Sequence, residues 1–131
     1  MKSQFLTDLV VKQVDDKTWA LEASLEYTSA LLNDLLIAPK GFVTDFASVP
    51  RVPIAYTLFG NRAHRESVIH DYLYQTHLTT KAIADKVFLE AMEARGKPFW
   101  VRWVMYLGVR VGGGSAYKTG KERFKLLNQG A

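Results

Sequence analysis

The feature that most limits the fold is a change in hydrophobic period along the chain. Between residues 19 and 27, the odd-numbered positions hold Trp, Leu, Ala, Leu and Tyr, and the even-numbered positions hold Ala, Glu, Ser and Glu. A two-residue period places the large apolar side chains on one face of a β-strand. From residue 62 onward, the pattern is instead helical. The sequence therefore predicts an α+β fold in which strands precede helices.

Two more strands are expected beside residues 19–27. Residues 9–11 begin a short strand that ends at the polar turn 15–17, so these two strands form a hairpin. Residues 35–38 form a third strand, which ends at the Pro-Lys-Gly sequence 39–41. We expect a β-hairpin or three-stranded sheet with one buried face.

Three helices are expected in the second half, at residues 62–76, 79–94 and 99–111. Thr79 or Thr80 supplies an N-cap for the second helix, Gly96 ends it, and Pro98 suits the first turn of the third. The chain is then one domain, 1–131, with a β part (1–40), an irregular motif loop (41–61), a helical part (62–112) and a basic tail (113–131) that has a short helical pattern at residues 121–127. The sheet packs on a C-terminal three-helix unit.

Composition excludes several classes of function. The chain has no cysteine, which rules out a disulfide framework and a thiolate metal site. Its 17 Lys and Arg against 13 Asp and Glu give a net charge of +4, but no specific nucleic-acid motif accompanies the excess. We find no signal peptide and no stretch of about 18 apolar residues that would span a membrane.

The most informative residues are His70 and Asp71, followed by Tyr74 and then by Asp85. His70 and Tyr74 are one helical turn apart and share a face. The short loop after residue 76 lets the second helix fold back, which brings Asp85 within reach of the His70 ring. One carboxylate then orients the imidazole, and its other nitrogen acts as a base. Asp71 remains available to hold a hard cation.

The motif HDxxY followed by ADxxF resembles the catalytic core of the secreted calcium-dependent phospholipases and of the phospholipase domain in parvovirus capsids. The resemblance covers about twenty residues. It implies that His70 is the catalytic base, that Asp85 and Tyr74 support it, and that Asp71 binds Ca²⁺. The glycine-rich calcium loop and the disulfides typical of the secreted enzymes are absent here.

A second resemblance covers nearly the whole chain. The segment GFVTDFASVPR at residues 41–51, then HDYLY, then ADxxF, is similar to a small family of uncharacterised proteins from tailed phages and prophages. The resemblance implies a phage origin, and therefore a location in the host bacterial cytoplasm or in the virion, without naming a reaction.

Several interpretations stay open. Asp45 is either a further metal ligand or a turn cap; Ser48 and Arg51 either bind a substrate or phosphate or have structural roles. The helix at 99–111 is expected to be a central core helix, or else to leave one side for membrane lipid, for a phage or host protein, or for an oligomer contact. Two functions follow: a hydrolase of a lipid or other ester, or a non-enzymatic virion or host-interaction protein whose His-Asp-Tyr-Asp cluster is structural.

Overall fold

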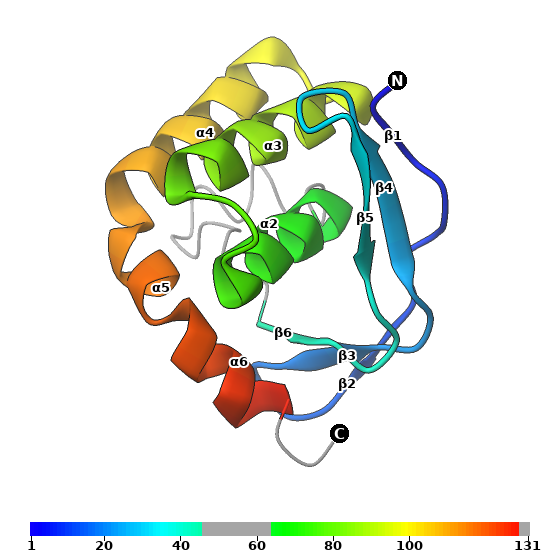
Figure 1. Ribbon diagram of the computed structural model, residues 1–131, viewed down its shortest axis with the longest axis vertical. Coiled ribbons are helices and arrows are strands. Elements are labelled where there is room, and N and C mark those ends of the chain that lie inside the picture. The colour runs from blue at the N-terminus through cyan, green and yellow to red at the C-terminus, as the bar shows by residue number, and fades with distance from the viewer. Residues whose placement is uncertain (46–63, 129–131) are drawn as a thin grey trace.

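The computed structural model describes residues 1–45 and 64–128 and has the predicted α+β architecture (Figure 1). The strands are β1 (Gln4–Phe5), β2 (Val11–Gln13), β3 (Trp19–Leu21), β4 (Leu25–Ser29), β5 (Asp34–Ala38) and β6 (Val43–Thr44). The helices within the described residues are α2 (His64–Thr76), α3 (Lys81–Ala94), α4 (Phe99–Gly112), α5 (Gly114–Lys118) and α6 (Gly120–Asn128).

The described strands form two antiparallel three-stranded sheets, with the orders β1-β4-β5 and β2-β3-β6. The predicted hairpin is confirmed, since β2 pairs with β3. The prediction of one strand over residues 19–27 is wrong, because the chain leaves the sheet β2-β3-β6 after Leu21 and enters the sheet β1-β4-β5 at Leu25. The backbone nitrogen of Leu21 donates a hydrogen bond to the carbonyl oxygen of Phe42, whereas Leu25 pairs with Ala38 of β5. Leu21 at the end of β3 and Leu25, Tyr27 and Ser29 of β4 are buried, whereas Ala23 in the bend between the two strands is exposed.

The antiparallel pair α2 and α3 matches the predicted helices. Thr80 is the N-cap of α3, and its side chain accepts a hydrogen bond from the backbone nitrogen of Ile83. Gly96 follows the end of α3 with a φ of +75°, a conformation that favours glycine. Short connections on both sides of α3 therefore fix its direction against α2 and α4.

The segment expected to be a basic tail folds into α5 and α6, and α6 lies against α2 and β6 (Figure 1). Gly120 is buried at the start of α6, where a Cβ atom would overlap the backbone carbonyl of Tyr74. The described helices therefore number five, and the expected unit of three is too small.

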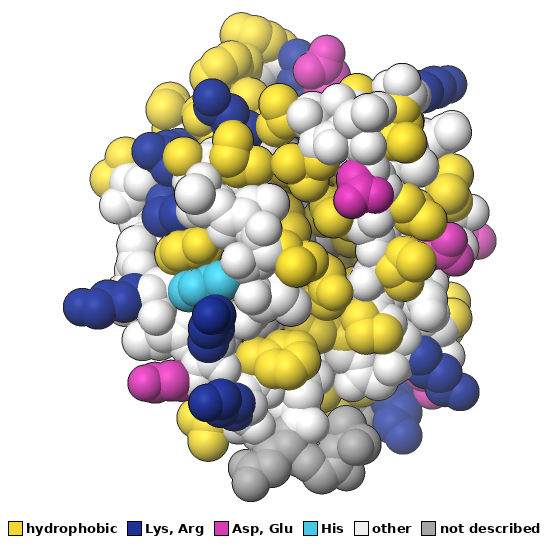
Figure 2. Space-filling model, in the orientation of Figure 1, with side chains coloured by type: hydrophobic (Ala, Val, Ile, Leu, Met, Phe, Trp, Pro, Cys, Tyr) yellow, Lys and Arg dark blue, Asp and Glu magenta, His cyan; other side chains and the backbone are white. Residues whose placement is uncertain are grey.

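Helix α4 lies on the outside of the molecule, so the expectation of a central core helix is wrong (Figure 1). Val101, Met105 and Val109 are buried in a cluster with residues of α3. On the other side, Trp100 is 53% exposed and Leu107 is 55% exposed. Hydrophobic side chains alternate with Lys and Arg along the upper left edge in Figure 2, where α4 lies. None of the helices in residues 1–45 and 64–128 has both the length and the hydrophobicity to cross a membrane.

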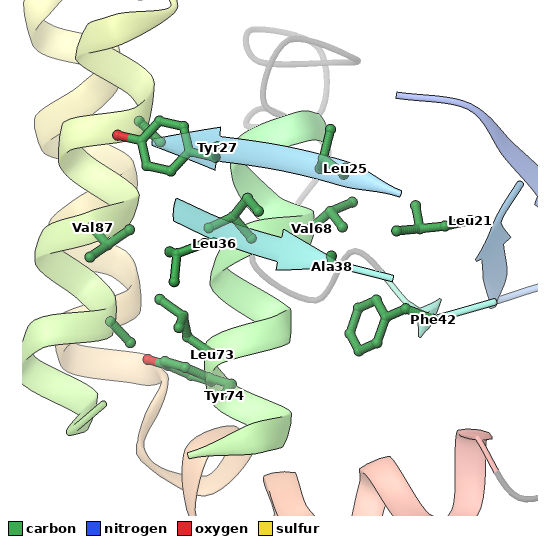
Figure 3. Packing of buried hydrophobic residues seen from close by; sticks show 13 residues of the cluster. Leu21, Leu25, Tyr27, Leu36, Ala38, Phe42, Val68, Leu73, Tyr74 and Val87 are labelled. Atoms are coloured by element: carbon green, nitrogen blue, oxygen red, sulfur yellow. The ribbon is translucent and has the colours of Figure 1, made fainter. Parts of the chain in front are cut away.

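The main core lies between the strands and α2 (Figure 3). Leu25 and Leu36 reach from the sheet towards Val68 of α2. At the edge of this core, Glu90 of α3 accepts hydrogen bonds from the side chains of Tyr27 (2.6 Å) and Ser29 (2.7 Å). The sheet is thereby fastened to α3 as well as to α2, and α2 becomes the central element.

Candidate functional site

Asp85 of α3 faces His70 and Tyr74 of α2, as the helix spacing predicts. Its Oδ1 lies 2.7 Å from Nε2 of His70 and accepts a hydrogen bond of 2.6 Å from the hydroxyl of Tyr74. All three side chains are buried, His70 and Asp85 almost completely. The predicted contact between His70 and Asp85 is therefore confirmed, whereas the catalytic roles of these residues stay predictions.

Two cations hold the other oxygen of Asp85. Lys81, one turn earlier in α3, donates to Oδ2 at 2.8 Å, and Arg110 of α4 donates at 3.1 Å. Burial raises the pKa of Asp85, but the hydrogen bonds from His70, Lys81 and Tyr74 outweigh it and lower the pKa below its usual value. Asp85 is thus ionised at neutral pH. Since an ionised carboxylate only accepts hydrogen bonds, Nε2 of His70 donates.

The imidazole of His70 is held in its neutral form. Burial lowers the pKa of His70, and the adjacent Asp85 carboxylate opposes this shift only in part. The ring lies between Tyr74 and Phe88, with centroid distances of 4.1 and 4.7 Å. Asp85 therefore fixes the tautomer of His70, and the two aromatic rings fix the orientation of its plane.

Asp71, the next residue along α2, is the centre of a second polar cluster. Its Oδ2 accepts hydrogen bonds from Thr44 (2.7 Å) and Gln75 (2.9 Å), and its Oδ1 accepts one from Arg123 of α6 (2.6 Å). Burial raises the pKa of Asp71 to about 6, with the charge of Asp45 adding to the rise and Arg123 opposing it. The cluster joins the motif at residues 41–51 to the HDYLY motif through Thr44.

A pocket of about 220 Å³ lies next to both clusters. It is lined by His70, Asp71, Tyr74 and Arg123 and by glycines of the segment that ends α4, including Gly108 and Gly112. Because glycine has no side chain, backbone forms this wall and leaves room in front of His70. A neutral, oriented imidazole and a guanidinium thus face one small cavity.

The donors around Asp71 do not fit a calcium ion. Calcium takes about six to eight oxygen ligands. Both oxygens of Asp71 instead accept hydrogen bonds, one of them from a guanidinium, and no group of three or more His, Cys, Asp or Glu in the described ranges is placed to hold a metal. The charge of Asp45 raises the pKa of Asp71, but among the described residues the two carboxylates belong to no group that could hold a metal. Ser48 and Arg51 lie outside the described residues.

Residues 19–109, more than half of the chain, match the family model described as "Protein of unknown function (DUF1353)". The chain belongs to this DUF1353 family. No curated protein and no solved structure matches it. The part that matches DUF1353 contains His70, Asp71, Tyr74 and Asp85, whereas Arg123 lies beyond it.

The cations and small polar residues that complete the site could not all be predicted from the sequence. Lys81 had a detectable signal, since it lies four residues before Asp85 on the same helix face. Arg110 lies in the apolar helix α4, and Arg123 lies in the basic segment that follows it. No local pattern connects either arginine with an aspartate so far away in the sequence.

Proposed function

We propose that this DUF1353 protein is a phage-encoded hydrolase in which His70, oriented by Asp85, activates water to cleave a lipid ester or another ester. The main support is the 2.7 Å contact between Nε2 of His70 and Asp85 at the wall of the glycine-lined pocket. The phage origin rests on the sequence resemblance to tailed-phage and prophage proteins. The substrate class rests on the resemblance of HDxxY and ADxxF to phospholipases.

The chemistry needs one group to move a proton. His70, oriented by its 2.7 Å contact with Asp85, would take a proton from water as the water oxygen attacks the ester carbonyl carbon. The imidazolium then formed is stabilised by the ionised Asp85. When the carbon–oxygen bond to the alcohol breaks, the imidazolium returns the proton to the leaving oxygen, which gives an acid and an alcohol. Arg123, at the same pocket, supplies positive charge for the transient oxyanion.

We derive no step through a metal ion, because the groups around Asp71 do not fit one. The calcium-binding role implied by the phospholipase resemblance is therefore left to experiment. Arg123 already supplies the positive charge that a cation would bring to this pocket.

The test is release of fatty acid from fluorogenic phospholipid vesicles, zwitterionic and anionic, with calcium or with chelator. The wild type is compared with His70→Gln, which keeps an amide donor for Asp85 but cannot exchange a proton, and with Lys86→Ala, an exposed change on α3. We expect His70→Gln to lower release by about 100-fold or more and Lys86→Ala to leave it unchanged. No release from folded wild type on either vesicle would overturn the lipid hydrolase. Release that stops in chelator would restore the calcium role of Asp71.

A second candidate is a non-enzymatic virion or host-interaction protein in which the same residues only hold the fold together. It is favoured by the number of elements that the carboxylates connect: Asp85 joins α2, α3 and α4, and Asp71 joins β6, α2 and α6. Under this function, His70→Ala would lower the free energy of unfolding by about 1–3 kcal/mol, since a buried partner is left unsatisfied, and no turnover would exist to be lost.

A further inference from the structure

The outward face of α4 has an unusual share of large apolar side chains. Its exposed members, three of them aromatic, lie on consecutive turns of one helix: Phe99, Trp100, Trp103, Val104, Leu107 and Val111. Phe99 is 67% exposed and Val111 is 87% exposed. We call this set the α4 face. Apolar patches of this kind mark binding sites for proteins or for membranes.

The segment that carries the α4 face is rich in cations, three of which, Lys97, Arg110 and Arg123, are paired with carboxylates of α2 and α3. Residues 97–128 contain seven Lys and Arg and one acidic residue, Glu122; the cations are Lys97, Arg102, Arg110, Lys118, Lys121, Arg123 and Lys125. Arg102 lies over the ring of Phe99, 5.6 Å from its centroid, and Lys118, Lys121 and Lys125 are exposed on α5 and α6. Tryptophan and leucine on one face with flanking cations are the composition of helices that lie in the surface of an anionic bilayer.

The α4 face also adjoins the pocket. Gly108, which lines the pocket, is exposed and follows Val104 by one helical turn; Gly112 lines the pocket one turn later. A flat surface that covers the α4 face would therefore lie beside the entrance to the cavity in front of His70.

We propose that the α4 face binds the surface of an anionic lipid bilayer, with the aromatic side chains at the level of the head groups and the lysines of α5 and α6 contacting lipid phosphates. The identification of bilayer phospholipid as the substrate of His70 rests on the proposed hydrolase function. The binding itself does not.

A second copy of the chain fits the α4 face less well. A two-fold symmetric interface brings the same patch of both copies together. Lys97, Arg110 and Arg123 are already paired with carboxylates of α2 and α3, but the exposed lysines of α5 and α6 would then repel their counterparts in the other copy. Anionic lipid offers the complementary charge without that repulsion.

The test measures cosedimentation of the protein with phosphatidylcholine vesicles and with vesicles that also contain phosphatidylglycerol. We expect binding to the anionic vesicles, at least about tenfold weaker binding in high salt, and a blue shift of tryptophan fluorescence. The double variant Trp100→Ser/Trp103→Ser should bind at least tenfold more weakly. Leu6→Ser/Val14→Ser, which removes apolar side chains of similar exposure from the strand side, should bind like the wild type.

Three results would overturn the inference. These are no binding of the wild type to anionic vesicles, equal binding by the two double variants, and a dimer in solution that only the α4 variant dissociates. Binding without lipid hydrolysis would support the α4 face as a membrane surface and count against the hydrolase. Hydrolysis of a soluble ester without vesicle binding would support the hydrolase and count against the α4 face as a membrane surface.

Discussion

Replacing Gly120 with alanine would push α6 away from α2. The new Cβ would lie 2.7 Å from the carbonyl carbon of Tyr74 and 3.3 Å from Cα of Gln75, and it would overlap the Tyr74 carbonyl oxygen. These are backbone atoms of α2, so no side chain can turn aside to make room. The strain has to be relieved by a shift of α6, which would stretch the 2.6 Å contact between Arg123 and Asp71.

The change in the free energy of unfolding caused by Gly120→Ala has three contributions. Overpacking a closely fitted site costs about 1–3 kcal/mol, and loss of a charged hydrogen bond to a buried carboxylate costs about 1.5–3 kcal/mol. The better helix propensity of alanine returns at most about 1 kcal/mol. We expect Gly120→Ala to lower the free energy of unfolding by about 1.5–5 kcal/mol, measured by urea denaturation.

Gly114→Ala is the matched control. Gly114 begins the neighbouring helix α5, is exposed, and has no atom within 4 Å of the position of a Cβ. The alanine there should change the free energy of unfolding by no more than about 0.5 kcal/mol. Equal stabilities of the Gly120 and Gly114 variants would refute the close contact between α6 and α2.

Three further predictions concern the carboxylates of Asp85, Glu90 and Asp71. Asp85→Ala should lower the free energy of unfolding by about 1–3 kcal/mol, because it strands the Tyr74 hydroxyl and His70 in the core; thermal denaturation measures this. Glu90→Gln should cost about 1–2 kcal/mol in the same assay, since its three hydrogen bonds lose their charge. Asp71 binds its proton more tightly when folded, with a pKa of about 6 against 3.8, so its stabilising contribution is complete below pH 4 and is lost as the pH rises through 6. Relative to Asp71→Asn, the wild type should therefore lose up to about 3 kcal/mol of stability between pH 4 and pH 7 in urea titrations.

Each of these has a contrary outcome. An unchanged melting temperature for the Asp85 variant would mean that its network adds nothing to stability. If Glu90→Gln left the stability unchanged, the charged hydrogen bonds of Glu90 would not hold the sheet to α3. A stability difference between wild type and the Asp71 variant that does not vary with pH would show that Asp71 has an ordinary pKa in the folded protein.

Local spacing was enough to predict the pairing of His70 with Asp85. The two residues lie on consecutive helices joined by a short loop, so helix period and loop length together determine their distance. The two sheets were not predictable in this way. A two-residue period predicts which side of a strand is buried, and in the sequence it runs on through the bend between Leu21 and Leu25, although Ala23 there is exposed. Nothing in the pattern shows that the chain changes sheets there.

The position of α4 was misjudged for a related reason. Its apolar content indicates burial, but how much of a helix is buried depends on the number of neighbours that cover it. Of the described helices, α3 covers the side with Val101 and Met105, and the aromatic side is left at the surface. The partner of Asp71 was equally hidden, since Arg123 is 52 residues away.

That separation has a consequence for the order of assembly. His70 and Asp85 are 15 residues apart and can meet as soon as α2 and α3 form a hairpin, whereas Asp71 meets Arg123 only after a loop of 52 residues has closed. Contacts between distant segments form later because closing a long loop costs more entropy. The contact between His70 and Asp85 would therefore form early, and the wall of the pocket that includes Arg123 would form last. Amide hydrogens of α6 would exchange through partial openings that leave the α2–α3 hairpin intact. The pocket can therefore open while His70 and Asp85 stay in contact.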